Sequence, residues 1–374
     1  MNNKSTILDL SYYPVALKHG SKWIPMLVVL ALVISVVLLM LENDVLPLMM
    51  SVLPQETDKS VGFYRDLLFL WVSETWWLGG FVLLAWFFGH KLDIQRILQW
   101  PLAGGRTRVL IVATQVVSLT FVLSVIISSQ TLDRFPNSAD EYVYLFQAET
   151  LSEGKLWETP HPHADFFNFN HIAQKDGVRA GRFPPGWPLI LSTAFYLNIP
   201  PFLINPFLGL IAMIVFFNFA KRFYDEKVAL WAMVSLGLSS YFIFNAAAFF
   251  SHMSCLVVTL CFVYCVQLYF EKEGVPYALL AGFFLGIIII IRYYTAVIIF
   301  FPFFAWIVYQ YRLKAIAPLF WIGIGTLPPL GYLLWYNYSI TGSAFVPVTV
   351  WAYQNEALGF VKGHSLLKGV EHVI

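Results

Sequence analysis

The sequence predicts an all-α polytopic membrane protein, and three observations support this fold class. Hydrophobic residues make up 59% of the 374 residues and charged residues only 12%, whereas an ordinary soluble chain carries about 25% charge. The mean hydropathy is +0.68. Apolar runs of about 20 residues recur along the chain, and a helix of that length crosses a bilayer.

These runs predict about nine transmembrane helices. The predicted spans are residues 23–41, 67–88, 109–129, 202–220, 228–247, 253–270, 277–293, 295–311 and 317–336. The first run is too long for the apolar core of a signal peptide, so we expect it to be retained as a span. A shorter run at 187–199 cannot cross alone. We expect it to form a half-buried or re-entrant helix that ends at Pro200 and Pro201.

The spans divide the chain into five segments with a predicted orientation. The segments are a cytoplasmic N-terminal segment (1–22), the first three spans (23–129), an extracytoplasmic loop (130–186), the remaining transmembrane core (187–338) and an extracytoplasmic C-terminal segment (339–374). With the N-terminus inside, most lysines and arginines of the short loops face the cytoplasm, as such loops prefer.

The long loop opens on an acidic pair, Asp140-Glu141, within a predicted amphipathic helix at 140–153. Ser138 is a candidate N-cap, and Glu141 is its capping-box partner. A carboxylate on a helix along the membrane surface can act as a general base for an incoming hydroxyl. The alternative is that both acids only favour the positive end of the helix dipole.

Charged and polar side chains from separate stretches of the chain are predicted to lie at the same membrane face. Arg182 lies in a Pro- and Gly-rich turn at 181–188 and could clamp a phosphate, or reach to lipid headgroups. Arg292 interrupts an apolar span, where an arginine is costly unless it faces a cavity or a partner. The residues that converge on this face from separate stretches are Asp140, Glu141, His171, Arg182, His252, Arg292 and Asn337.

Metal and nucleotide signals are weak. His161, His163 and Asp165, with His171 nearby, resemble a string of metal ligands, but Pro162 and the short spacing fit poorly with three or four convergent ligands. We therefore assign no metal site. The sequence has no Gly-rich phosphate loop, and we expect no cofactor and no nucleic-acid partner.

Between about Asp140 and His364 the chain contains several short motifs whose order along the sequence resembles that of one enzyme family. The chain resembles the bacterial polyprenyl-phosphate-sugar-dependent glycosyltransferases of the glycosyltransferase C superfold, which are related to the dolichyl-phosphate-mannose protein mannosyltransferases and the lipid A aminoarabinose transferase. The motifs are Asp140-Glu141-Tyr142, Leu151-x-x-Gly154-x-Leu156, Phe166-Phe167-x-x-x-His171, Gly181-Arg182, Pro184-Pro185-Gly186-Trp187-Pro188, Asn205-Pro206, Ser251-His252, Arg292-x-x-Thr295-Ala296, Tyr336-Asn337 and Thr341-Gly342.

The resemblance implies an enzyme of the bacterial inner membrane with an extracytoplasmic active site in the 130–186 loop. The donor would be a polyprenyl-phosphate-linked sugar and the acceptor a lipid, glycan or protein hydroxyl, with inversion at the anomeric carbon. Asp140 would be the base, and Glu141 would support it or position the acceptor. The expected substrate-binding residues are His171, Arg182, His252, Arg292, Tyr293 and Asn337, with the two arginines on the donor phosphate. Relatives often continue past Ile374, which implies a shortened form.

Two other classes of protein compete with this interpretation. A transporter or lipid-linked sugar flippase would use buried charges such as Glu74 and Arg292 along a transport path. However, the sequence has no evident internal repeat, and its polar residues gather at one membrane face rather than at the midplane. A structural or assembly subunit would tolerate the loss of Asp140.

Overall fold

The computed structural model describes residues 104–352, except 164–165, 167–168 and 273, together with 29–34, position 101 and isolated positions between 72 and 83. The chain divides into two compact units, Met1–Trp100 with Val370–Ile374, and Pro101–Gly369. All elements named below belong to the second unit. Most of the first two predicted spans, including Glu74, and the segment 353–374 lie outside the described residues.

The second unit is mostly helical. Its helices are α5 (Gly105–Ile126), a π-helical turn η2 (Ile127–Thr131), α6 (Ala139–Ser152), α7 (Gly186–Tyr196), η4 (Pro201–Leu203), α8 (Ile204–Phe223), α9 (Glu226–Gly237), α10 (Ser240–Ala247), α11 (His252–Lys272), α12 (Val275–Ile291), α13 (Tyr293–Tyr311), η5 (Arg312–Ala315), α14 (Ile316–Thr341) and α15 (Val348–Ala352). The predicted surface helix is α6, and the predicted short helix after the loop is α7.

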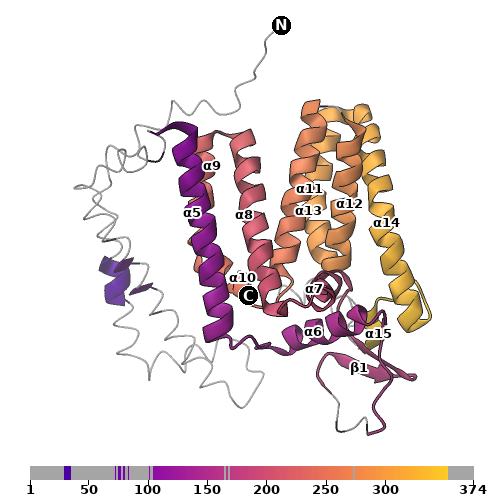
Figure 1. Ribbon diagram of the computed structural model, residues 1–374. Coiled ribbons are helices and arrows are strands. Elements are labelled where there is room, and N and C mark those ends of the chain that lie inside the picture. Colours follow the sequence, from indigo (N-terminus) through magenta and orange to yellow (C-terminus); the bar gives the residue numbers. More distant parts are fainter. Residues whose placement is uncertain are drawn as a thin grey trace. The chain divides into compact units, whose positions relative to one another are not determined.

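Several of these helices have the length and composition of membrane spans. Among the described residues, four helical stretches qualify, namely Gly105–Thr131, Pro201–Phe223, His252–Lys272 and Tyr293–Thr341. A fifth is added if α9 and α10, which are bent by 61° at their junction, are taken as one span, while α12 is apolar but shorter. The last stretch holds both α13 and α14, and the chain reverses between them at η5 (Figure 1). The helical membrane-protein class is thus supported, and the number of nine spans stays a prediction.

The long helices alternate in direction, so their connections gather at two opposite ends (Figure 1). One end, here called the α6 end, carries α6, α7, α10, α15 and a β-hairpin. At the other end, here called the basic end, α8 joins α9, α11 joins α12 and α13 joins α14. The cations of the basic end are Arg106, Arg108, Lys221, Arg222, Lys227, Lys272, Arg312 and Lys314. Short connections rich in lysine and arginine are typical of the cytoplasmic face of a membrane protein.

Helices α12 and α14 pack with their backbones in close contact. A Cβ added at Gly282 would collide with the carbonyl oxygen of Ile322, and one added at Gly325 would collide with that of Leu279. The hydroxyl of Thr326 donates to the carbonyl oxygen of Gly282 at 3.0 Å. Small residues that allow such an approach are the usual basis of helix association in membranes.

The C-terminus of α6 is closed by a Schellman motif. Gly154 has φ +75°, and its N–H donates to the carbonyl oxygen of Leu151 at 3.0 Å. The N–H of Lys155 donates to the carbonyl oxygen of Thr150 at 3.1 Å. This pairing satisfies the last carbonyls of the helix, and the positive φ explains why glycine occupies position 154.

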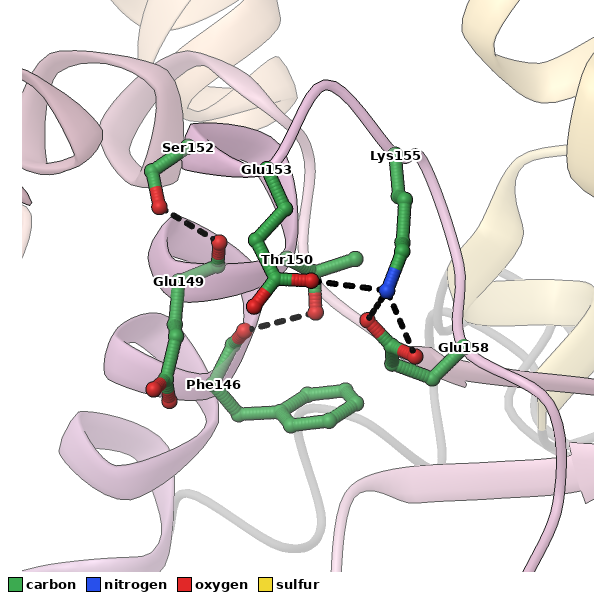
Figure 2. Close-up of polar contacts among 7 residues, drawn as sticks. All are labelled: Phe146, Glu149, Thr150, Ser152, Glu153, Lys155 and Glu158. Carbon is green, nitrogen blue, oxygen red and sulfur yellow. Dashed lines mark hydrogen bonds and ion pairs between the residues drawn. The ribbon is translucent and has the colours of Figure 1, made fainter. Parts of the chain in front are cut away.

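The chain leaving α6 is held by a small polar cluster (Figure 2). Lys155 Nζ donates to Glu153 at 2.7 Å and to Glu158 at 3.3 Å. These bonds, with Glu153 the stronger cause, raise the pKa of Lys155. Glu158 also exchanges two backbone hydrogen bonds with Arg179, at 2.7 and 2.9 Å. The loop after α6 is therefore tied to the β-hairpin that follows it.

The loop also contains this antiparallel hairpin, which the sequence interpretation did not include. Strands β1 (Ile172–Lys175) and β2 (Val178–Gly181) are joined by a two-residue turn. Asp176 and Gly177 have φ values of +53° and +79°, as a type I′ turn requires at both central positions. Asp-Gly between strand-forming residues is a strong hairpin signal, so the sequence did contain the information.

Replacing Gly177 by Val should weaken the hairpin. A β-branched residue in a left-handed conformation costs roughly 1–2 kcal/mol, and Gly177 has open space around it, so backbone strain is the main effect. We expect faster hydrogen exchange of the β1 and β2 amides, measured by mass spectrometry. Asp176→Asn is the matched control, because Asn-Gly suits the same turn. Equal protection in Gly177→Val and wild type would contradict the turn assignment.

Candidate functional site

The first turn of α6 presents two carboxyl groups in very different environments. Ser138 is the N-cap, and its hydroxyl accepts from the N–H of Glu141 at 3.3 Å, as predicted. The Asp140 side chain is 45% exposed, whereas Glu141 is only 2% exposed. The two neighbours therefore have different surroundings, and Asp140 is much the more exposed of the two.

Glu141 ties α6 to the unwound segment between α10 and α11. Its Oε2 accepts from the backbone N–H of Phe249 at 2.9 Å, and its Oε1 accepts from the Ser138 hydroxyl at 3.0 Å. The carbonyl oxygen of Phe249 in turn accepts from Trp187 Nε1 on α7 at 2.8 Å. Buried backbone groups outside a helix need such partners. The structure thus gives Glu141 a clear positioning task.

Glu141→Gln should destabilise the fold. The amide nitrogen of glutamine cannot accept a hydrogen bond, so either the Phe249 N–H or the Ser138 hydroxyl loses its partner. We expect a loss of about 1–3 kcal/mol in the free energy of unfolding, measured by chemical denaturation in detergent. Glu149→Gln, at an exposed position of the same helix, is the control and should change little. An unaltered Glu141→Gln variant would show that these contacts contribute nothing.

His171 and Arg182 lie next to Asp140 because the hairpin brings them there. The N–H of Arg182 donates to the carbonyl oxygen of His171 at 3.0 Å, which continues the strand pairing by one residue. His171 Nδ1 lies 3.0 Å from Arg182 Nη1. Its Nε2 lies 3.5 Å from Asp140 Oδ1. Three of the predicted site residues therefore form a continuous chain of polar contacts.

Tyr144 lies one helical turn after Asp140 and belongs to the same group. Burial raises the pKa of its phenol; the Ser251 hydroxyl opposes this rise, the Asp140 charge adds to it, and the charges of Arg292 and Arg182 oppose it. The phenol therefore keeps its proton at neutral pH and can donate a hydrogen bond. Arg292 and Ser251 are thus close enough to influence Tyr144.

Arg292 occupies the single extended residue between α12 and α13, with φ −152° and ψ 99°. Arg292 is half-buried, and its charge interacts electrostatically with His252 at the start of α11. His252 Nδ1 is buried and has no hydrogen-bond partner in the described part of the chain. A Cβ at Gly186 would lie 2.7 Å from the backbone of Ile290, so α7 approaches this junction closely. Arg292 is thus placed at the α6 end rather than inside the bundle.

Two cavities lie near these residues. An apolar groove of about 260 Å³ runs along α12 and α13, and is lined by Leu285, Ile289, Ala296, Val297, Phe300, Phe301 and Phe304. A mixed pocket of about 210 Å³ is lined by Leu132, Asn137, Glu141, Phe244, Asn245, Ala248 and Phe250. Because Ile289 and Ala296 lie on either side of Arg292 in the chain, the groove starts about one helical turn from that cation.

The other two predicted substrate-binding residues are Asn337 and Tyr293. Asn337 is buried near the end of α14, and its amide donates to the carbonyl oxygen of Ala344 at 3.4 Å. Tyr293 begins α13, directly after Arg292. The sequence interpretation also missed Tyr144, although the four-residue spacing from Asp140 places both on one helix face.

Among the described residues, no three His, Cys, Asp or Glu side chains are grouped so as to hold a metal ion. His161 and His163 lie close together, with ring centroids 5.8 Å apart, and Asp165 lies outside the described residues. Comparison with protein-family models, curated proteins and solved structures finds no match for this chain.

Proposed function

We propose that the protein is an integral membrane glycosyltransferase. It moves a sugar from a polyprenyl phosphate to an acceptor hydroxyl outside the cytoplasm, with inversion at the anomeric carbon. The observation that carries this proposal is the position of Asp140. Its half-exposed carboxyl group lies at the α6 end of the helix bundle, in one neighbourhood with Tyr144, Arg182 and Arg292.

The proposed topology follows from the charge distribution. The basic end faces the cytoplasm by the positive-inside preference, which places the α6 end and the whole 130–186 loop on the outer face. We further propose nine spans in a bacterial inner membrane, two of them preceding α5, with a cytoplasmic N-terminus. The site then lies where the head of a membrane-anchored lipid meets water.

The donor would lie with its phosphate at Arg292 and its isoprenoid chain in the groove of α12 and α13. The groove is lined by apolar side chains alone, which suits a hydrocarbon chain. The adjoining guanidinium suits a phosphate group. His252, with its unpartnered buried Nδ1, is a further candidate for a polar contact with the donor head.

In the proposed reaction, Asp140 takes the proton of the acceptor hydroxyl as the oxygen forms a bond to the anomeric carbon. The bond between this carbon and the phosphate oxygen breaks, and polyprenyl phosphate leaves with the electron pair. Arg292 stabilises the charge that develops on the leaving phosphate. Because the donor is already activated, the reaction needs no nucleotide and no cofactor.

A transfer assay tests this proposal. Proteoliposomes with the full chain are given polyprenyl phosphates that carry a radiolabelled pentose or hexose, with bacterial envelope extract as the acceptor source. The proposal predicts that label leaves the prenyl phosphate and appears on an acceptor. Label that only changes leaflets while it stays on the prenyl phosphate would indicate a flippase and would overturn the proposal.

A further inference from the structure

We propose that His171 is a positioning residue that orients the Asp140 carboxylate, and that Arg182 selects the tautomer of His171 needed for this task. The inference deepens the proposed function, since it takes Asp140 as the base, but its structural part does not depend on sugar transfer. The resemblance implied that Arg182 binds the donor phosphate. The present inference instead gives Arg182 the task of orienting the histidine.

The backbone fixes where the two side chains meet. His171 directly precedes β1 and Arg182 directly follows β2, so they oppose each other at the open end of the hairpin. The carbonyl oxygen of Arg182 accepts from the hydroxyl of Thr349 in α15 at 2.7 Å. The ring of Phe183 packs against Tyr144 at 4.6 Å between centroids and lies 6.0 Å from the His171 ring. The hairpin end is thereby held between α6 and α15.

Hydrogen-bonding chemistry then determines the tautomer. A guanidinium only donates hydrogen bonds, so the 3.0 Å contact between Arg182 Nη1 and His171 Nδ1 requires Nδ1 to accept. The proton of the neutral ring must therefore reside on Nε2. This nitrogen lies 3.5 Å from Asp140 Oδ1. A doubly protonated ring would set an N–H of His171 against an N–H of Arg182.

The contact between His171 Nε2 and Asp140 is long, and catalytic hydrogen bonds commonly tighten when a substrate binds. With Oδ1 engaged by the imidazole, Oδ2 of Asp140 is the oxygen left for the acceptor hydroxyl. His171 thus holds the carboxyl group of Asp140 in one rotation, which is the positioning role proposed for it.

The backbone of His171 adds an independent indication. Its φ of +71° lies in the left-handed region, which non-glycine residues adopt rarely and which often marks functional sites. A glycine would relieve this conformation but would remove the ring. Backbone preference alone would favour glycine at this position, so the imidazole side chain is the reason for histidine here.

Nitrogen NMR on the full chain tests the tautomer directly. The protein is labelled with ¹⁵N-histidine and placed in nanodiscs, and the His171 signals are identified as those lost in His171→Gln. We expect one protonated and one unprotonated ring nitrogen with the Nε2–H pattern, and a shift toward mixed tautomers in Arg182→Met. A predominant Nδ1–H tautomer or a fully protonated ring at neutral pH would overturn the proposal, whether or not any sugar transfer is found.

Kinetics test the consequence for Asp140. His171→Gln keeps an N–H near the place of Nε2, whereas His171→Asn suits the left-handed backbone but is too short to reach Asp140. We expect kcat to fall by about 10-fold or more in His171→Asn, with KM little changed and with partial rescue in His171→Gln. Full kcat in His171→Asn, together with loss in Asp140→Asn, would refute the positioning role and leave the proposed function standing.

Discussion

We expect Asp140→Asn to lose sugar transfer by about 10²–10⁴-fold, the usual contribution of a general base, while the protein folds as the wild type does. Asparagine has nearly the same shape, and the half-exposed position of Asp140 means that no buried group loses its only partner. The amide cannot take the proton of the acceptor hydroxyl. The rate of label transfer in proteoliposomes and a thermal unfolding curve measure the two halves of this expectation.

Glu149→Gln is the matched control for this variant. Glu149 is exposed on the same helix, more than two turns from Asp140, and the same chemical change there should leave transfer unaltered. If both variants transferred sugar at the wild-type rate, Asp140 would not be the base. If both lost transfer alike, the effect would be one of surface charge rather than of the site.

The second large effect is expected at the contact between α12 and α14. Gly282→Val should strongly reduce the yield of folded protein, because its side chain would be forced onto the backbone of Ile322. Overpacking of this kind typically costs 1–3 kcal/mol, and here rigid backbone rather than a movable side chain blocks the space, so we expect roughly the upper end of that range. Thermal unfolding in detergent and size-exclusion chromatography would record the loss.

Gly323→Ala serves as the control, because Gly323 lies in the same helix pair but has open space around its Cα. Alanine there should be neutral or stabilise the helix by roughly 0.5–1 kcal/mol. Equal stability of Gly282→Val and Gly323→Ala would contradict the close packing of α12 on α14. Because α12 carries Arg292 at its end, a loss of this packing should also disturb the site.

Much of the helical arrangement was predictable, since it depends on local signals. Apolar runs of span length and the Ser138 cap gave α6 and the long helices α8 and α11 to within a few residues. One run, 228–247, appears instead as two helices bent by 61°. At this break the Ser239 hydroxyl caps α10 by accepting from the N–H of Phe242, and the carbonyl oxygen of Gly237 accepts from the hydroxyl of the distant Thr120 at 3.0 Å. Hydropathy records neither contact.

The site was predictable only in part, because it depends on contacts between distant segments. Asp140 and Arg292 stand out as charges in an apolar chain. The pairing of His171 with Arg182, by contrast, is set by the hairpin that the Asp176-Gly177 turn closes. The burial of Glu141 against Phe249 arises from a contact 108 positions apart in sequence, and no local pattern predicts it.

Mass spectrometry of glycolipids and glycoproteins tests the central claim most directly. Cells that produce the wild-type protein are compared with cells that produce Asp140→Asn at equal abundance and with cells that lack the gene. We predict a species heavier by one sugar residue that appears only with the wild-type protein. The same species at the same level in cells producing Asp140→Asn, or its absence from all three, would contradict a glycosyltransferase that acts through Asp140.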